Sequence, residues 1–169
     1  KVKDINYRNS LKNFSKAITK KTKIIFIANP NNPTGTYLTK NELNEFILRL
    51  PKRILLVIDA AYAEYITKKD YTPGEDLVKK NNNVIMTRTF SKIYGLAGLR
   101  LGWAYCPKYV ADIFNKVRLP FNINVAAMKA GIVALNDKNF YIKSVKHNSY
   151  YLNWLTKEII KLGLIPIPS

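Results

Sequence analysis

Three short apolar runs, separated from one another by helical or turn patterns, constrain the fold of this chain more than any other feature. They are Lys23–Ala28, Arg53–Ile58 and Asn83–Thr87. Continuous apolar runs of this length are typical of parallel strands that are covered on both faces. A fourth run, Leu101–Cys106, follows the third after a connection that contains glycines. The alternation of strands with helices predicts an α/β fold, a mostly parallel sheet flanked by helices.

Helical periodicity predicts the remaining elements. Thr39-Lys40-Asn41-Glu42 is a capping box, because a threonine is followed three residues later by a glutamate. Gly163 is predicted to cap the last helix, and Leu164–Ser169 is predicted to begin a further strand. Thr67–Asn82 is expected to be a polar connection with a turn at Pro73-Gly74. The predicted helices cover Ser10–Ile18, the segment from Thr39 to about Leu50, Pro107–Val117, Val125–Leu135 and Lys138–Leu162.

The connection after the third strand, within Thr89–Gly102, carries a group of residues suited to chemistry. Lys92 follows the hydroxyl residues Thr89 and Ser91 and precedes Arg100. A lysine amine can form a Schiff base with an aldehyde, while hydroxyls and a guanidinium bind phosphate through hydrogen bonds. Together they predict a site for pyridoxal 5'-phosphate. The alternative is a lysine-rich surface turn between two strands.

This stretch resembles the lysine signature of the type I aminotransferases, most closely their histidinol-phosphate aminotransferase branch. Ser-Lys, Gly-Leu-Ala-Gly, Leu-Arg and Gly-Trp all occur in the order found in that family. The resemblance implies that Lys92 forms an imine with the cofactor aldehyde and later moves a proton. It also implies that Thr89, Ser91 and Arg100 bind the cofactor phosphate. Gly95 and Gly98 are expected to allow turns or close approaches that a side chain would block.

A second motif, Asn29-Pro30-Asn31-Asn32-Pro33-Thr34-Gly35, follows the first strand. Its two prolines exclude it from a helix interior or a strand ladder, so the residues alone predict only a turn. The string also resembles a well-known sequence of the same family. This resemblance implies that Asn32 donates a hydrogen bond to the phenolic oxygen of the cofactor, as an amide can do without adding charge.

A third motif, Asp-x-Ala-Tyr, follows the second strand. Asp59 lies at the carboxyl end of that strand, where open α/β sheets bind their ligands; a helix N-cap is the alternative. The resemblance implies that Asp59 pairs with the protonated pyridine nitrogen of the cofactor and that Tyr62 binds its phenolic oxygen. Ala60 departs from the family, which commonly has glutamate there. Glu64, Tyr65 and Tyr71 are interpreted as wall or surface residues.

The composition bears on partners and location. With 28 Lys and Arg against 11 Asp and Glu, the net charge is +17, which could indicate binding of nucleic acid. The basic residues are scattered, however, and neither zinc-ligand spacing nor an RNA-binding aromatic signature accompanies them, so a solvated basic surface is favoured. Cys106 is the one cysteine and fits core packing in a reducing compartment. We expect a cytoplasmic protein without a metal, nucleic-acid or membrane partner.

The resemblance extends over essentially the whole chain and predicts its domains. Residues 1–137 would form the cofactor-binding large domain, incomplete at its N-terminus. Residues 138–169 would form an interdomain helix and the start of a truncated small domain. The chain is therefore expected to be an excerpt, inactive by itself, of a homodimeric transaminase. The reaction implied is reversible amino transfer between histidinol phosphate and 2-oxoglutarate, in histidine biosynthesis.

Other functions remain open at the level of sequence. Within the same fold, an aromatic-amino-acid aminotransferase, a phosphothreonine decarboxylase or a β-lyase could share these motifs. From other classes, a basic nucleic-acid-binding module without catalysis and a purely structural α/β interaction domain are the alternatives. The segment Arg118–Asn124 resembles a family segment that borders the active site and the dimer contact, but no residue in it is assigned a catalytic role. His147 is expected to lie on the surface.

Overall fold

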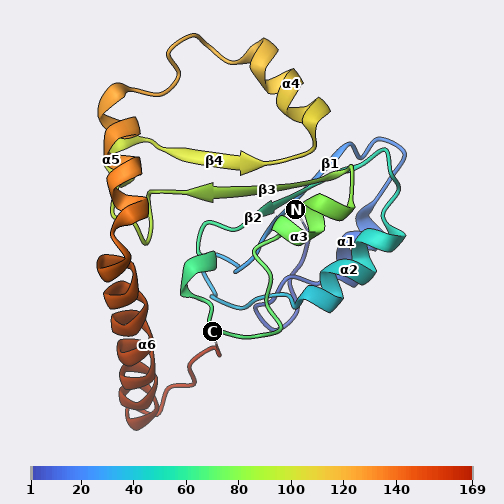
Figure 1. Ribbon diagram of the computed structural model, residues 1–169. Helices are drawn as coiled ribbons and strands as arrows, with labels where there is room; N and C mark the ends of the chain where they lie inside the picture. The colour runs from blue at the N-terminus through green and yellow to red at the C-terminus, as the bar shows by residue number, and fades with distance from the viewer. Residues whose placement is uncertain (1, 169) are drawn as a thin grey trace.

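The computed structural model describes residues 2–168, which form one sheet flanked by helices (Figure 1). The strands are β1 (Ile24–Ala28), β2 (Leu55–Asp59), β3 (Val84–Thr89) and β4 (Gly102–Tyr105), in the order β1-β2-β3-β4. The first three are parallel, and β4 runs antiparallel to β3. The prediction of a mostly parallel sheet flanked by helices is confirmed.

The helices match most of the predicted segments. Two expectations were wrong: Thr67–Asn82 contains a helix, α3, and residues 164–168 form no strand, while Ser169 lies outside the described residues. Gly163 has a φ of 76°, as expected of a helix cap. The helices are α1 (Leu11–Ala17), α2 (Lys40–Arg49), α3 (Glu75–Lys80), α4 (Lys108–Val117), α5 (Val125–Asn136) and α6 (Lys138–Lys161), with short 3₁₀ turns η1 (Ala63–Tyr65) and η2 (Ala97–Leu99).

Side chains define where several helices begin. The Thr39 hydroxyl accepts a hydrogen bond from the Glu42 amide, and the Glu42 carboxylate accepts one from the Thr39 amide at 2.8 Å. Asn124 and Asp137 accept from the amides of Ala127 and Phe140 in the first turns of α5 and α6. These contacts satisfy amides that have no partner within their helices.

One face of the sheet carries the main hydrophobic core. Side chains from alternate positions of β1, β2 and β3 pack there against α1, α2 and α3. Full burial of an aliphatic side chain contributes about 1.5–3 kcal/mol, so this layer dominates the stability of the sheet. The hydrophobic side chains with at most 1% exposure are Ile27, Leu38, Leu43, Ile47, Ile54, Leu56, Ile58, Ala60, Leu77, Val84, Met86 and, in another part of the molecule, Ala127.

The opposite face of the sheet is covered only in part. Val110 of α4 packs on Val57 and Ile85 there, while Ile24 and Phe26 at the β1 edge are 48% and 67% exposed. Because side chains alternate between faces along a strand, Asp59 lies on this second face, two residues beyond Val57. The carboxylate of Asp59 is therefore on the open side of the sheet.

The C-terminal helices border the carboxyl ends of the parallel strands. Helix α5 packs closely at Gly131, where an added Cβ would come within 2.5 Å of Leu101. Helix α6 then runs along the side of the molecule and contacts η1 (Figure 1), and the Tyr141 hydroxyl donates to the Glu64 carbonyl at 3.4 Å. Across residues 2–168, no helix has the length and apolar character needed to cross a membrane.

Candidate active site

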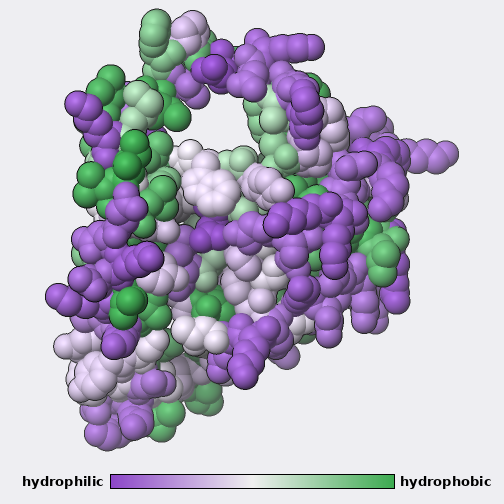
Figure 2. Space-filling view, in the orientation of Figure 1, coloured by the Kyte–Doolittle hydropathy of each residue, from purple (hydrophilic) through white to green (hydrophobic). Residues whose placement is uncertain are grey.

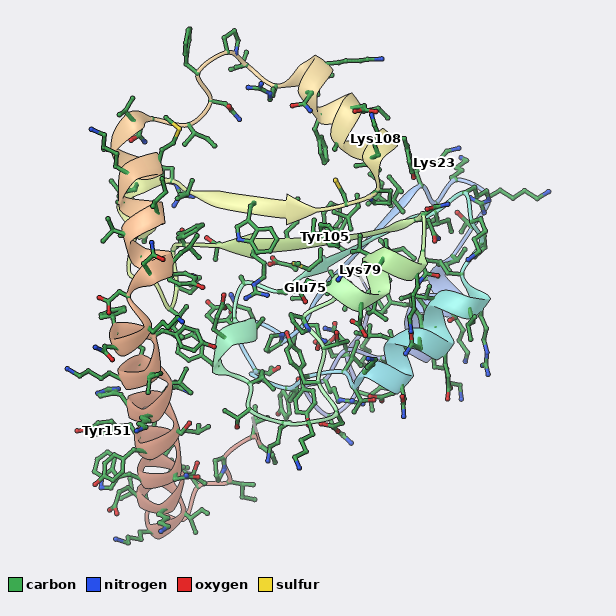
Figure 3. The ribbon with its side chains drawn as sticks, viewed as in Figure 1. Lys23, Glu75, Lys79, Tyr105, Lys108 and Tyr151 are labelled. Carbon is green, nitrogen blue, oxygen red and sulfur yellow. The ribbon has the colours of Figure 1, made fainter. Side chains whose placement is uncertain are left out.

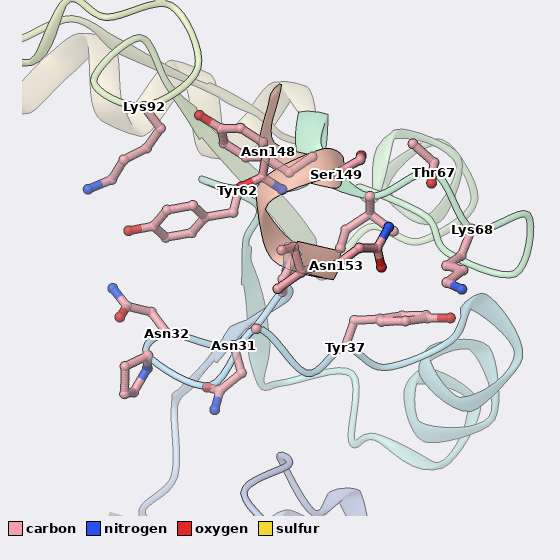
Figure 4. Close-up of a pocket in the computed structure, with 16 residues that line it drawn as sticks. Asn31, Asn32, Tyr37, Tyr62, Thr67, Lys68, Lys92, Asn148, Ser149 and Asn153 are labelled. Carbon is pink, nitrogen blue, oxygen red and sulfur yellow. The ribbon is translucent and has the colours of Figure 1, made fainter. Parts of the chain in front are cut away.

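A cavity of about 650 Å³ lies where the connections after β1, β2 and β3 approach α6. Asn32, Tyr62 and Lys92, one from each connection, line the same side of it (Figure 4). The Lys92 ammonium lies 5.2 Å from the centroid of the Tyr62 ring, within the range of a cation–π contact. The fold thus brings together an amine, a phenol and an amide that are far apart in the sequence.

The loop that carries Asn32 is held closed by a buried side chain. The side-chain nitrogen of Asn29, Nδ2, donates to the Leu38 carbonyl at 3.1 Å. The side-chain oxygen of Asn29, Oδ1, accepts from the Leu38 backbone amide at 2.7 Å. The Tyr71 hydroxyl donates to the Asn29 carbonyl at 2.8 Å, and the Asn31 amide donates to the Thr36 carbonyl within the loop. Both Asn–Pro peptide bonds of this loop are cis. The two hydrogen bonds between Asn29 and Leu38 fix the loop at its two ends.

The connection after β2 holds Asp59 at its start. Asp59 Oδ1 accepts a hydrogen bond from the Ala61 amide at 3.2 Å, which is a local turn contact. The N-cap alternative was wrong, because the next helical turn, η1, has Tyr62 at its N-cap position and no side-chain cap. Within residues 2–168 its Oδ2 accepts none, so one carboxylate oxygen is available on the open face of the sheet. Asp59 does not line the cavity.

The connection after β3 folds back on itself around Lys92. Thr89 Oγ1 accepts from the Ser91 amide at 3.0 Å, and the Gly95 amide donates to the Lys92 carbonyl at 2.9 Å. Gly95 has a φ of 69°, which confirms its expected role in a turn. A Cβ added at Gly98 would meet only open space, and the φ of Gly98 is not positive, so that expectation was wrong for Gly98.

Arg100 ends η2 in the left-handed region, at a φ of 58°, and its Nη1 donates to the Ala97 carbonyl at 2.7 Å. A left-handed non-glycine residue costs roughly 1–2 kcal/mol, and such strain clusters at functional sites. Like Thr89 and Ser91, Arg100 is close to Lys92 in the sequence but does not line the cavity. The functional roles of these residues stay predictions.

Polar residues that the sequence did not single out form the other side of the cavity. Tyr37 and Lys68 come from loops, and Asn148 and Asn153 from α6 (Figure 4). Burial and a hydrogen bond to Asp70 raise the pKa of Tyr37. The polar residues of an amphipathic helix are normally assigned to solvent, so the pattern of α6 gave no signal that two of them face a cavity.

Glu64 differs most from its expected position as a wall or surface residue. Its side chain is 4% exposed and forms an ion pair with Arg88 of β3 at 2.6 Å. Burial, and after it the negative charge of Glu64, raises the pKa of Tyr65 and of Tyr94. Glu64 and Arg88 do not line the cavity, but Glu64 directly precedes Tyr65, which does. His147 is exposed, as expected, and its ring lies against that of Tyr151 in a tilted arrangement, with centroids 4.4 Å apart.

Cys106 follows β4 and packs against the small apolar cluster under α4, as core packing predicts. Burial raises the pKa of its thiol, which disfavours the reactive thiolate. Among the residues that the structure describes, no group of three or more His, Cys, Asp or Glu side chains is placed to hold a metal ion.

Comparison with known proteins gives a consistent family. The family described as aminotransferase class I and II matches residues 1–163. The chain is 48% identical over 166 residues to a histidinol-phosphate aminotransferase of Paramagnetospirillum magneticum, covering 98% of this chain and 46% of that protein. It is 50% identical over 163 residues to the enzyme of the same description from Pelagibacter ubique, covering 96% of this chain and 45% of that protein.

A solved structure agrees with these relatives. The chain is similar to histidinol-phosphate aminotransferase from Sinorhizobium meliloti in complex with pyridoxal-5'-phosphate, with a TM-score of 0.90 and 32% identity. The similarity covers 98% of this chain and 45% of that chain. The sequence therefore spans less than half the length of the relatives that it matches.

Proposed function

The chain belongs to the family of class I and II aminotransferases, and from this premise we propose that it is the cofactor-binding part of a histidinol-phosphate aminotransferase. The proposed reaction is reversible amino transfer between histidinol phosphate and 2-oxoglutarate. The observation that carries the proposal is the placement of Lys92, Tyr62 and Asn32 around one cavity at the carboxyl ends of parallel strands. The names of the relatives support the choice of substrate.

The residues present fit pyridoxal phosphate chemically. Lys92 supplies an exposed amine for the aldehyde, and the Asn32 amide and Tyr62 hydroxyl supply donors for the phenolic oxygen. Asp59 supplies a carboxylate for the ring nitrogen. When bound, the cofactor supplies an electron sink that stabilises a carbanion at the substrate α-carbon.

Each of these residues has a separate task in the proposed reaction. The Lys92 amine would hold the cofactor through its aldehyde, and once the substrate amine has replaced Lys92 there, the freed amine would take the proton from the substrate α-carbon. Tyr62 and Asn32 hold negative charge on the phenolic oxygen by donating to it. The Asp59 carboxylate keeps the ring nitrogen protonated, since an opposite charge in contact favours the charged form.

Phosphate binding is proposed for Thr89, Ser91 and Arg100, which together offer hydroxyl and guanidinium donors. Arg100 uses Nη1 for the Ala97 carbonyl. A guanidinium has five N–H donors in a fixed fork, so others remain for an anion. The basic surface of a chain with net charge +17 would draw in both the anionic cofactor and an anionic substrate.

We also propose a homodimer. The accessible surface is 11749 Å², against about 8,500 Å² expected for a compact monomer of this mass. Figure 2 shows hydrophobic side chains gathered over α5 and a gap beneath the segment that joins it to α4. In that segment Leu119 and Phe121 are 76% and 97% exposed. A second subunit, as well as further chain of the length found in the relatives, would cover such a surface.

The remaining proposals concern organisation. We propose that residues 1–137 belong to the cofactor-binding domain and that residues from 138 onward lead to a smaller domain; Asp137, which caps α6, marks the division. A cytoplasmic location follows from the small metabolites proposed as substrates.

The test uses the intact protein that carries these residues, loaded with pyridoxal phosphate. We expect histidinol phosphate to be converted in the presence of 2-oxoglutarate faster than any aromatic amino acid. We expect Lys92→Ala to abolish turnover, while Lys68→Ala, a lysine at the other side of the same cavity, keeps it. Equal activity of the wild type and Lys92→Ala would refute the assignment, and exclusive decarboxylation of phosphothreonine would replace the proposed substrate.

A further inference from the structure

The ion pair between Glu64 and Arg88 is the most buried pair of opposite charges in residues 2–168. The side chains are 4% and 13% exposed, and Arg88 Nη2 lies 2.6 Å from Glu64 Oε1. A second carboxylate, that of Glu75, lies 3.3 Å from Arg88 Nη1. Glu75 stands at the start of α3 (Figure 3). The guanidinium also lies 5.7 Å from the centroid of the Trp103 ring on β4. Four elements therefore meet at Arg88.

The pair joins the connection that carries Tyr62 to the end of β3, from which the connection that carries Lys92 starts. Glu64 follows Tyr62 by two residues, and Arg88 precedes Lys92 by four. The ladder between β2 and β3 ends with the hydrogen bond from the Ala60 amide to the Thr87 carbonyl. Beyond that bond, the Glu64–Arg88 pair is the hydrogen-bonded link between residues 61–66 and residues 88–96 in the described part of the chain.

The pair is poorly arranged for stability alone. Burying two charges costs free energy that their attraction repays only when the remaining polar atoms are also bonded. Here Glu64 Oε2 and Arg88 Nε are buried and have no hydrogen-bond partner among residues 2–168. The fixed fork of an arginine between two carboxylates and an aromatic face does, however, set an orientation closely.

A contrasting pair lies elsewhere in the molecule. Arg8 and Glu42 form two parallel hydrogen bonds of 2.7 and 2.6 Å, but both side chains are more than one-third exposed. That pair ties the N-terminal segment to the start of α2, and Arg8 also donates to the Tyr37 carbonyl in the connection after β1. The pair contacts neither the connection that carries Tyr62 nor the one that carries Lys92. Arg8–Glu42 is therefore a matched control: it has the same chemistry, without a link to Tyr62 or Lys92.

We propose that the Glu64–Arg88 pair is a positioning device that holds the Tyr62 connection against the Lys92 connection, so that the phenol and the amine keep their relative placement. The role rests on the proposed function, because it concerns the proposed cofactor groups. Glu64 and Arg88 act through their neighbours and are not catalytic residues. The contact from Tyr141 to the Glu64 carbonyl extends the same device to α6.

The test compares Glu64→Gln, which removes the charge at nearly constant shape, with Glu42→Gln in the intact protein. The first readout is hydrogen exchange at the amides of Gly95 and Leu96, which donate to Lys92 and Phe90 in the connection after β3. We expect exchange there to accelerate about tenfold or more in Glu64→Gln, without acceleration in the β2–β3 ladder. In Glu42→Gln these two amides should exchange as in the wild type.

The second readout separates kcat from KM. Misplacement of reacting groups by a fraction of an ångström should lower kcat about 10- to 100-fold while KM for the amino donor changes little. Arg88→Lys, which keeps the charge but loses the fork, should recover only part of the loss. If Arg88→Lys does not fold, Glu64→Gln decides alone.

Unchanged exchange at Gly95 and Leu96 in Glu64→Gln would overturn the proposal, as would exchange that rises equally throughout the sheet, the mark of a purely structural pair. The exchange comparison can be made without cofactor. Absence of cofactor binding at Lys92 in the wild type would be a different result, because it would refute the proposed function itself.

Discussion

Replacing Asn29 with alanine should loosen the loop that carries Asn32 and thereby weaken cofactor binding. Asn29 is fully buried and makes two hydrogen bonds to Leu38, which is itself 1% exposed. In Asn29→Ala the amide and the carbonyl of Leu38 would both lose their partner. Each buried polar group left without a partner costs about 1–3 kcal/mol, so we expect a loss of about 2–4 kcal/mol of stability once partial access of water is allowed for.

Part of that loss should appear in the cofactor affinity, since the bonds close the loop on which Asn32 sits. If about 1.4 kcal/mol of the lost stability appears as weaker cofactor binding, the dissociation constant for pyridoxal phosphate rises about tenfold. Urea unfolding of the intact protein would measure the stability, and titration of the cofactor absorbance would measure the affinity.

Asn83→Ala supplies the control. Asn83 is also buried, and its amide donates to the Ile54 carbonyl at 3.0 Å, but it precedes β3 at the end of the strands opposite the site. Asn83→Ala should lose stability with unchanged cofactor affinity. The reasoning would be refuted if Asn29→Ala and Asn83→Ala bound the cofactor equally well.

Two further predictions concern carboxylates. Asp59→Asn should keep the fold, because an amide can still accept from the Ala61 amide, but should slow single-turnover chemistry about 100-fold or more; an unchanged rate would exclude its proposed charge role. Hydrogen bonding to Arg8 lowers the pKa of Glu42 to about 2, below its ordinary value of 4.5. The contribution of ionised Glu42 to the free energy of unfolding is therefore present above pH 4.5 and is lost as the pH falls toward 2. After allowing for solvent screening we expect about 1 kcal/mol between wild type and Glu42→Gln at pH 7. Urea midpoints at pH 7 and pH 3 would show the gap narrowing, and a constant gap would contradict it.

Much of the fold follows from local signals in the sequence. The apolar runs that became β1, β2 and β3 need cover on both faces, and the capping box at Thr39 fixes the start of α2. Helix α3 gave no such signal, because six residues are too few to establish a period and its last turn is lysine-rich. Its two buried residues, Leu77 and Val78, are held by contact with the sheet. The expected strand from Leu164 failed because a strand needs a neighbour, and residues 164–168 have none among the described strands.

The candidate site was predictable to the extent that its residues stand in contiguous motifs. Asn32, Tyr62 and Lys92 each lie just after a strand, and parallel strands bring such positions to one edge. The pairing of Glu64 with Arg88 could not be predicted, since 24 residues separate them and only the three-dimensional arrangement shows that both are buried. The contribution of Asn148 and Asn153 likewise depends on how α6 lies against the loops, which its periodicity does not specify.

Reduction of the cofactor-loaded protein with borohydride, followed by peptide mapping, tests the central claim most directly. We predict one modified lysine, Lys92, with no modification of Lys68 in the same cavity and none in Lys92→Ala. A label spread over several surface lysines, or one that persists undiminished in Lys92→Ala, would contradict the assignment of Lys92 as the residue that binds the aldehyde.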